Sequence, residues 1–121
     1  MPHLIVDYSR NIHNLAQEKL LKHLNQALIT TGLFQPADIK SRIHKSDVYV
    51  IGDNDLSQAY IHTRLFILEG RTAEEREQLS QTLLTALKNF KGYEAYTLNL
   101  QLCAELLEMP VANYAKAEVQ L

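Results

Sequence analysis

Pro2 is the residue near the start of the chain with the clearest potential for chemistry. It follows Met1 directly and precedes an apolar, β-branched run over residues 4–6, which is typical of a strand. If Met1 is removed, the Pro2 nitrogen becomes a secondary amine that its ring and the sheet hold in place. An α-amino group titrates near pH ~8 and burial lowers its pKa, so this amine can act as a base at neutral pH. A Met-Pro start is common by itself, and the role of Pro2 therefore depends on the residues around it.

A row of basic residues forms a second candidate group. Lys40, Arg42 and His44 alternate with Ser41 and Ile43, and the two-residue period of a strand places the three basic residues on one face. Like charges side by side on a strand repel one another, so such a row needs an explanation. It is either a solvated edge strand that its charges protect from aggregation, or a binding site for an anion. The spacing favours neither interpretation.

Arg71 stands directly before the predicted start of a helix. Thr72 and Glu75 have the spacing of a capping box, in which the threonine caps the helix and the glutamate reaches back to it. The free backbone N–H groups and the dipole at such a helix end favour an anion, and a neighbouring arginine would strengthen the site. The alternative is a surface ion pair of Arg71 with Glu74 or Glu75.

The elements that would position these residues alternate between strands and helices. Period-two patterns predict strands over residues 4–8, 39–51, 60–69 and 97–106. Apolar stripes predict one helix over residues 15–30, ended by Gly32, and a second that begins at Thr72 and whose stripe reaches Phe90. The two halves repeat the same order, which predicts an α+β, two-layer fold with a four-stranded sheet. The strand order stays open between a ferredoxin-like arrangement and two parallel strand pairs side by side, with both helices on one sheet face.

The composition indicates the class of protein. The 121 residues fit a single domain, 1–121, and a hydrophobic fraction of 46% is enough for a core. A net charge of −2 without any run of Lys and Arg argues against nucleic-acid binding. No apolar stretch reaches membrane-spanning length and no signal peptide is recognisable, so we expect a soluble cytoplasmic protein. The histidines lack metal-ligand spacing and no Gly-rich phosphate loop is present, so the residues indicate neither a metal site nor a phosphate-binding loop.

The sequence also allows predictions for the single cysteine and for the C-terminal tail. The single cysteine, Cys103, cannot form an internal disulfide, and its place in an alternating apolar segment predicts a buried, inert thiol. The tail from Glu108 through Pro110 to Leu121 is short and mixed in character. We expect it to wrap a neighbour or to pack on the rim of the fold.

Three segments taken in order carry a family resemblance. They are residues 1–6 (MPHLIV), residues 31–34 (TGLF) followed by 39–44 (IKSRIH), and residues 70–72 (GRT). Together they resemble 5-carboxymethyl-2-hydroxymuconate Δ-isomerase of the tautomerase superfamily, in which the N-terminal proline is the base. The resemblance runs in register from Pro2 to about Leu106. It implies the arrangement of two parallel strand pairs, a homotrimer with active sites at subunit contacts, chemistry without metal or cofactor, and a place in aromatic-compound catabolism (homoprotocatechuate degradation).

The resemblance also implies roles for individual residues. Pro2 matches the catalytic proline, and Arg71 matches a substrate-binding arginine. Lys40 stands where the family usually has the functional arginine of an Arg-Ser-Arg segment, and lysine keeps the charge but loses the bidentate fork that suits a carboxylate. Arg42 matches in type and compensates for that change only if its side chain points into the same site.

The expected function is that of an isomerase that moves a proton within an unsaturated 2-hydroxy/2-oxo polycarboxylate such as 5-carboxymethyl-2-hydroxymuconate. The expected partner is thus a small-molecule carboxylate substrate. One alternative is a related keto-enol tautomerase with a different 2-oxo acid substrate, for which the change to Lys40 leaves room. The other is a non-enzymatic, ferredoxin-like module in which Lys40, Arg42 and His44 bind an anion and Pro2 is passive.

Overall fold

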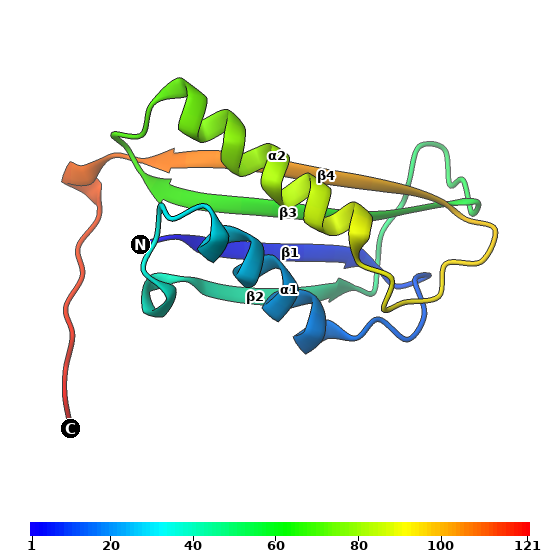
Figure 1. Cartoon of the computed structure of the whole chain (residues 1–121). Coiled ribbons are helices and arrows are strands. Elements are labelled where there is room, and N and C mark those ends of the chain that lie inside the picture. Colours follow the sequence, from blue (N-terminus) through cyan, green and yellow to red (C-terminus); the bar gives the residue numbers. More distant parts are fainter.

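The computed structural model describes all of residues 1–121 and shows a sheet covered by two helices (Figure 1). The elements are, in order, β1 (His3–Ser9), α1 (Gln17–Thr30), β2 (Lys40–Ser46), β3 (Gln58–Leu68), α2 (Ala73–Asn89) and β4 (Asn99–Met109). Short 3-10 turns over Pro36–Asp38 and Val111–Asn113 precede β2 and follow β4. The predicted order of strands and helices is confirmed.

The strand order decides between the two arrangements that the sequence left open. The sheet runs β2-β1-β3-β4, with β1 parallel to β2, β3 parallel to β4, and the central pair β1 and β3 antiparallel. In a ferredoxin-like sheet another strand would separate the two strands of each βαβ unit. Here the two strands of each unit are direct neighbours, so the ferredoxin-like arrangement, and with it the ferredoxin-like module, is excluded.

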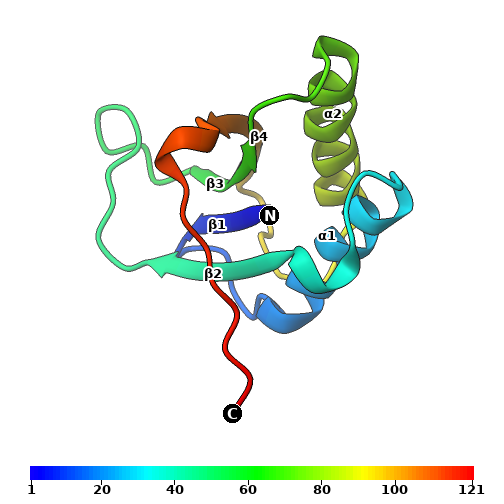
Figure 2. The same ribbon diagram turned by 90° about the vertical axis from the view of Figure 1, so that its left-hand side faces the viewer.

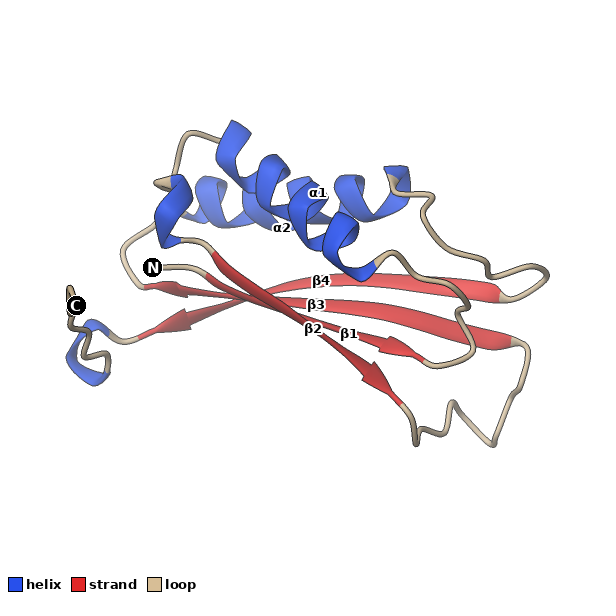
Figure 3. Ribbon diagram, turned by 90° about the horizontal axis from the view of Figure 1, so that it is seen from below, coloured by secondary structure: helices blue, strands red, loops and turns tan.

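Both helices lie on the same face of the sheet (Figure 3). The apolar stripe of α1 is buried through Leu20, Leu24 and Leu28, and that of α2 through a similar set that includes Leu79 and Leu83. From the sheet side, alternate residues of β1 and β3 fill the same core, because successive strand side chains point to opposite faces. The predicted capping box is present: the Thr72 hydroxyl accepts from the Glu75 N–H, and the Glu75 carboxylate accepts from the Thr72 N–H.

The other face of the sheet carries no helix and is called the open face below (Figure 3). It holds His3, Ile5 and Asp7 of β1, with an ion pair from Asp7 to Arg64 and a contact from His62 to a Glu105 carboxylate oxygen, both at 3.1 Å. Polar and charged side chains therefore occupy much of a surface that no helix covers.

Two expectations about local structure are wrong. The second strand was expected to reach Ile51 but ends at Ser46, because its partner β1 ends at Ser9 and turns away, leaving no ladder to continue. In the loop that follows, the side chains of Val48 and Val50 are 94% and 71% exposed. Cys103 is exposed rather than buried, since it points to the open face while its neighbours Leu102 and Ala104 pack on the core.

The ends of the last strand also differ from expectation. It runs over Asn99–Met109 instead of residues 97–106, because β3 continues to Leu68 and pairs with Met109. The part of the tail beyond β4 therefore starts at Pro110. None of the helices combines the length and the apolar character that crossing a bilayer would require.

Candidate active site

Pro2 is buried at the point where the sheet begins. Its carbonyl oxygen accepts a hydrogen bond of 3.1 Å from the backbone N–H of Lys40, the first residue of β2, and β1 starts at the next residue, His3. This contact extends the parallel ladder by one residue beyond the strand and fixes the Pro2 backbone. The N-terminus lies at the same end of the sheet as the loops that lead into β2 and α2 (Figure 1).

A cavity of about 320 Å³ opens beside the N-terminus, with Met1 as one of its walls. Its lining residues come from the loop after α1, the end of β3 and the start of α2: Met1, Phe34, Ile67, Leu68, Glu69, Gly70, Arg71 and Glu75. Pro2 does not line it, although the preceding residue, Met1, does. The structure therefore brings the N-terminus and Arg71, which are far apart in the sequence, to one cavity.

Arg71 is held in this cavity from three sides. Its Nη2 donates a hydrogen bond of 2.6 Å to the Leu33 carbonyl, and its guanidinium lies 5.3 Å from the centre of the Phe34 ring. Its Nη1 lies 3.9 Å from a carboxylate oxygen of Glu75. The surface ion pair considered from the sequence is thus present, but it coexists with a fixed orientation of the guanidinium at the cavity. The Arg71 side chain is 33% exposed.

The basic row of β2 lies along an edge strand, and only one end of it is near the N-terminus. Lys40, Arg42 and His44 are all exposed, opposite His3, Ile5 and Asp7 of β1. The Lys40 ammonium donates 2.9 Å back to the Ala37 carbonyl. Arg42 lies two residues further along the open face, where its charge acts on His3.

The charges near the N-terminus change its acidity. Burial lowers the pKa of the Met1 ammonium below its ordinary value of 8.0, Asp38 raises it, and Lys116, Arg71 and Lys40 lower it. Burial is also the main reason why the pKa of His3 is lowered, and the charges of Arg42 and Lys40 lower it further. A terminal amine in this environment is unprotonated over a wider pH range than one in water, which is what a base requires.

The C-terminal tail supplies residues that the sequence did not single out. The Tyr114 hydroxyl is 3.2 Å from His3 Nε2, and the Lys116 ammonium is 3.1 Å from the Met1 sulfur and 3.8 Å from an Asp38 oxygen. The tail thus passes the N-terminal end of the sheet, as Figure 2 shows. The only feature of the sequence that points to these contacts is the place of His3 next to Pro2. The tail itself has no periodic pattern from which its path could be predicted.

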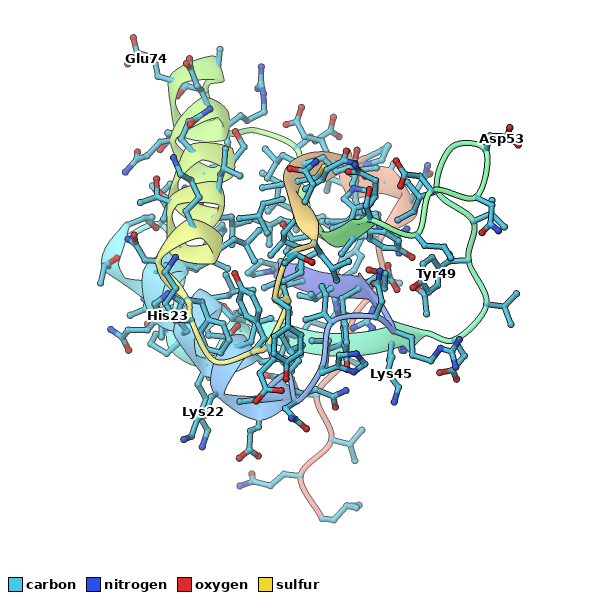
Figure 4. All side chains as sticks on the ribbon, turned by 90° about the vertical axis from the view of Figure 1, so that its right-hand side faces the viewer. Lys22, His23, Lys45, Tyr49, Asp53 and Glu74 are labelled. Atoms are coloured by element: carbon cyan, nitrogen blue, oxygen red, sulfur yellow. The ribbon has the colours of Figure 1, made fainter.

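Other cavities lie away from these residues. The largest, about 670 Å³, is at the opposite end of β1 and is bordered by Arg10, Lys45 and Tyr49. Figure 4 shows Lys45 and Tyr49 at that end, with His23 beside the helices. This cavity is larger than the one beside the N-terminus, but none of the candidate residues lines it. No group of three or more His, Cys, Asp or Glu side chains is placed to hold a metal ion.

Comparison with known proteins decides the family. A family model described as 5-carboxymethyl-2-hydroxymuconate isomerase matches residues 2–120. This chain belongs to the 5-carboxymethyl-2-hydroxymuconate isomerase family. It is 33% identical over 121 residues to 5-carboxymethyl-2-hydroxymuconate Delta-isomerase of Escherichia coli, an alignment that covers 98% of this chain and 96% of the relative. The resemblance seen in the sequence is confirmed, and the chain is an isomerase.

Solved structures agree with this family. A 5-carboxymethyl-2-hydroxymuconate isomerase from Deinococcus radiodurans R1 superposes with a TM-score of 0.85 at 26% identity, covering 98% of this chain and 90% of that one. A fused 4-OT symmetric trimer superposes with a TM-score of 0.72 at 20% identity, covering 95% and 91%. The second likeness shows the fold alone. The predicted tautomerase-like fold of the isomerase family is confirmed.

Proposed function

We propose that this isomerase moves a proton within an unsaturated 2-hydroxy/2-oxo polycarboxylate such as 5-carboxymethyl-2-hydroxymuconate, with the Pro2 nitrogen as general base. The observation that carries the proposal is the cavity that Arg71 shares with Met1, the residue attached to the nitrogen of the buried Pro2. It supports the proposal because a carboxylate substrate near the N-terminus would meet the cation of Arg71. The name of the Escherichia coli relative supports the substrate class.

Removal of Met1 is a condition of this mechanism. While Met1 is attached, the Pro2 nitrogen belongs to an amide and has no basic lone pair. Met1 is also part of the cavity wall, so its loss would free the nitrogen and enlarge the space in front of it. The substrate would occupy the space that Met1 vacates.

The reaction is an isomerisation, so the product contains the same atoms and electrons as the substrate. The Pro2 nitrogen takes a proton from the substrate's 2-hydroxyl or its allylic carbon, and the resulting dienolate spreads its negative charge toward a carboxylate. The protonated Pro2 then returns the proton to a different carbon, which completes the isomerisation. No covalent intermediate is required, and the ring of proline limits the conformations that the amine can adopt.

Cations around the cavity would bind the substrate and stabilise the dienolate. Arg71 would hold one carboxylate, because its guanidinium is already oriented by Leu33 and Phe34 and loses little freedom on binding. Lys40 would act as a point charge, once its ammonium exchanges the Ala37 carbonyl for a carboxylate. Arg42 would add positive charge near the site, since its charge already lowers the pKa of His3.

We also propose that the functional unit is a homotrimer with active sites at subunit contacts. The open face carries neither of the two helices, and Val48, Val50 and Leu56 in the loop after β2 are 94%, 71% and 79% exposed. Exposed apolar side chains on one loop fit contact with a second copy of the chain. The trimeric state of the fused 4-OT neighbour supports the number of subunits.

The test is an ultraviolet assay of enol-to-keto conversion on untagged protein whose loss of Met1 has been verified by mass spectrometry. We expect turnover of a polycarboxylate enol by the processed chain and none by a chain that retains Met1. A second candidate, a tautomerase for a different 2-oxo acid, is favoured by the lysine at position 40. Parallel assays on a phenylpyruvate-type enol separate the two, because the preferred substrate shows the higher kcat/KM.

A further inference from the structure

The C-terminal tail is fixed against the start of the sheet before it reaches Lys116. The Glu69 N–H donates to the Met109 carbonyl at 3.0 Å, and the Val111 N–H donates to a Glu69 carboxylate oxygen at 2.9 Å. Further along, the Tyr114 hydroxyl meets His3 Nε2 at 3.2 Å. Two attachment points therefore guide the tail from the end of β4 to the beginning of β1.

These attachments place the Lys116 ammonium beside the N-terminus. It lies 3.1 Å from the Met1 sulfur, 3.8 Å from Asp38 and 4.0 Å from Glu118, and its side chain is 32% exposed. A thioether is a weak acceptor, and the two carboxylates lie beyond ordinary hydrogen-bond distance. An ammonium has three donors, so Lys116 retains donors without a strong partner.

Loss of Met1 would remove the nearest of these neighbours. Because its ammonium lies 3.1 Å from the Met1 sulfur, Lys116 would border the space that the Met1 side chain leaves. Lys116 also has a larger electrostatic effect on the terminal amine than Arg71 or Lys40 has, which agrees with its position. The ammonium of Lys40, in contrast, is already bonded to the Ala37 carbonyl.

We propose that Lys116 is a specificity-determining residue of the active site, whose ammonium binds a second carboxylate of the substrate while Arg71 binds the first. The inference rests on the proposed function, because it assigns the substrate to the cavity at Pro2. Lys116 would supply the second carboxylate-binding cation in a chain that has lysine instead of arginine at position 40. The tail then acts as a selector that distinguishes polycarboxylate from monocarboxylate enols.

The kinetic test compares Lys116→Gln with Lys116→Arg in processed protein. We expect Lys116→Gln to raise KM for a tricarboxylate enol by about tenfold, the size expected for one charge-assisted hydrogen bond, with kcat little changed. KM for the monocarboxylate enol of phenylpyruvate stays the same, and Lys116→Arg keeps most of the affinity. The matched control is Lys22→Gln, a surface lysine on α1 whose side chain is 75% exposed. Equal changes in KM for both substrates, or no change, would overturn the proposal.

A binding experiment separates this proposal from the proposed function. Calorimetry measures the affinity of processed protein and of Lys116→Gln for unreactive propane-1,2,3-tricarboxylate and for benzoate. A loss of about tenfold for the tricarboxylate alone supports the role of Lys116 even if no substrate is turned over. Unchanged tricarboxylate affinity contradicts it even if the enzyme is active through Pro2.

Discussion

The backbone N–H of Lys40 donates a 3.1 Å hydrogen bond to the carbonyl oxygen of Pro2. This contact adds to the parallel ladder of β1 and β2 and joins the two strands of the first βαβ unit next to the proposed base. It fixes the backbone that carries the Pro2 nitrogen, and it places the start of β2 beside the N-terminus. A base held in this way loses little orientational freedom when a substrate binds.

Substitution of the proposed base should reduce turnover. In chains that have lost Met1, we expect Pro2→Ala to lower kcat by about 10²–10⁴, the usual contribution of general-base catalysis. The ultraviolet assay measures the effect, and mass spectrometry verifies that Met1 is lost in both chains. Full activity in Pro2→Ala would exclude Pro2 as the base.

Replacement of Arg71 should weaken the binding of negatively charged substrates and hardly affect that of neutral ones. We expect Arg71→Ala to raise KM for a carboxylate substrate by roughly 10- to 100-fold, as expected for loss of a charged hydrogen bond, and to affect a neutral ketone hardly at all. Because Arg71 also bonds the Leu33 carbonyl, melting temperatures are compared to detect unfolding. Arg71→Lys should recover part of the affinity. An equal loss for the neutral ketone would indicate a structural role instead.

The pH dependence of activity should respond to Asp38. The base must be unprotonated, so kcat/KM rises with pH through the pKa of the Pro2 amine. Burial lowers the pKa of the Met1 ammonium at this end of the sheet and Asp38 raises it, because its carboxylate stabilises the charged form; we expect both effects on the Pro2 amine of the processed chain. We therefore expect Asp38→Asn to move the acidic limb of the profile to lower pH, while Asp53→Asn in the distant turn leaves it in place. A shift to higher pH would contradict this electrostatic assignment.

The capping box of α2 should contribute to stability independently of chemistry. Thr72→Ala removes the side-chain acceptor for the Glu75 N–H, and we expect it to lower the free energy of unfolding by about 1 kcal/mol. Urea denaturation measures the change, with the exposed Thr97→Ala as control. A Thr72→Ala chain as stable as the parent would mean that the helix end is satisfied by water.

Assembly should depend on the apolar loop after β2. We expect the unmodified chain to elute with the mass of three chains in light-scattering chromatography. Val48→Ser combined with Val50→Ser should weaken that assembly, because it removes exposed apolar area that a second copy would cover. A monomer in the unmodified protein would rule out the trimer.

Local patterns in the sequence were sufficient for most of the fold. The alternation of apolar residues gave the strands, the three-and-four spacing gave α1, and the Thr72–Glu75 spacing gave the start of α2. Errors arose where a neighbour decides the outcome. The end of β2 depends on where β1 turns away, and the exposure of Cys103 depends on which sheet face the helices cover.

The sequence by itself determined the candidate base at Pro2, the cation at Arg71 and the family, because these follow from residue types at particular positions. Only the tertiary structure decided the strand order, since strand pairing is a contact between distant segments that local periodicity does not encode. The same holds for the site: one cavity unites Met1 and Arg71, and the tail brings Lys116 next to Met1. Contacts of that kind depend on how the tail crosses the sheet, and no local pattern in residues 110–121 specifies that path.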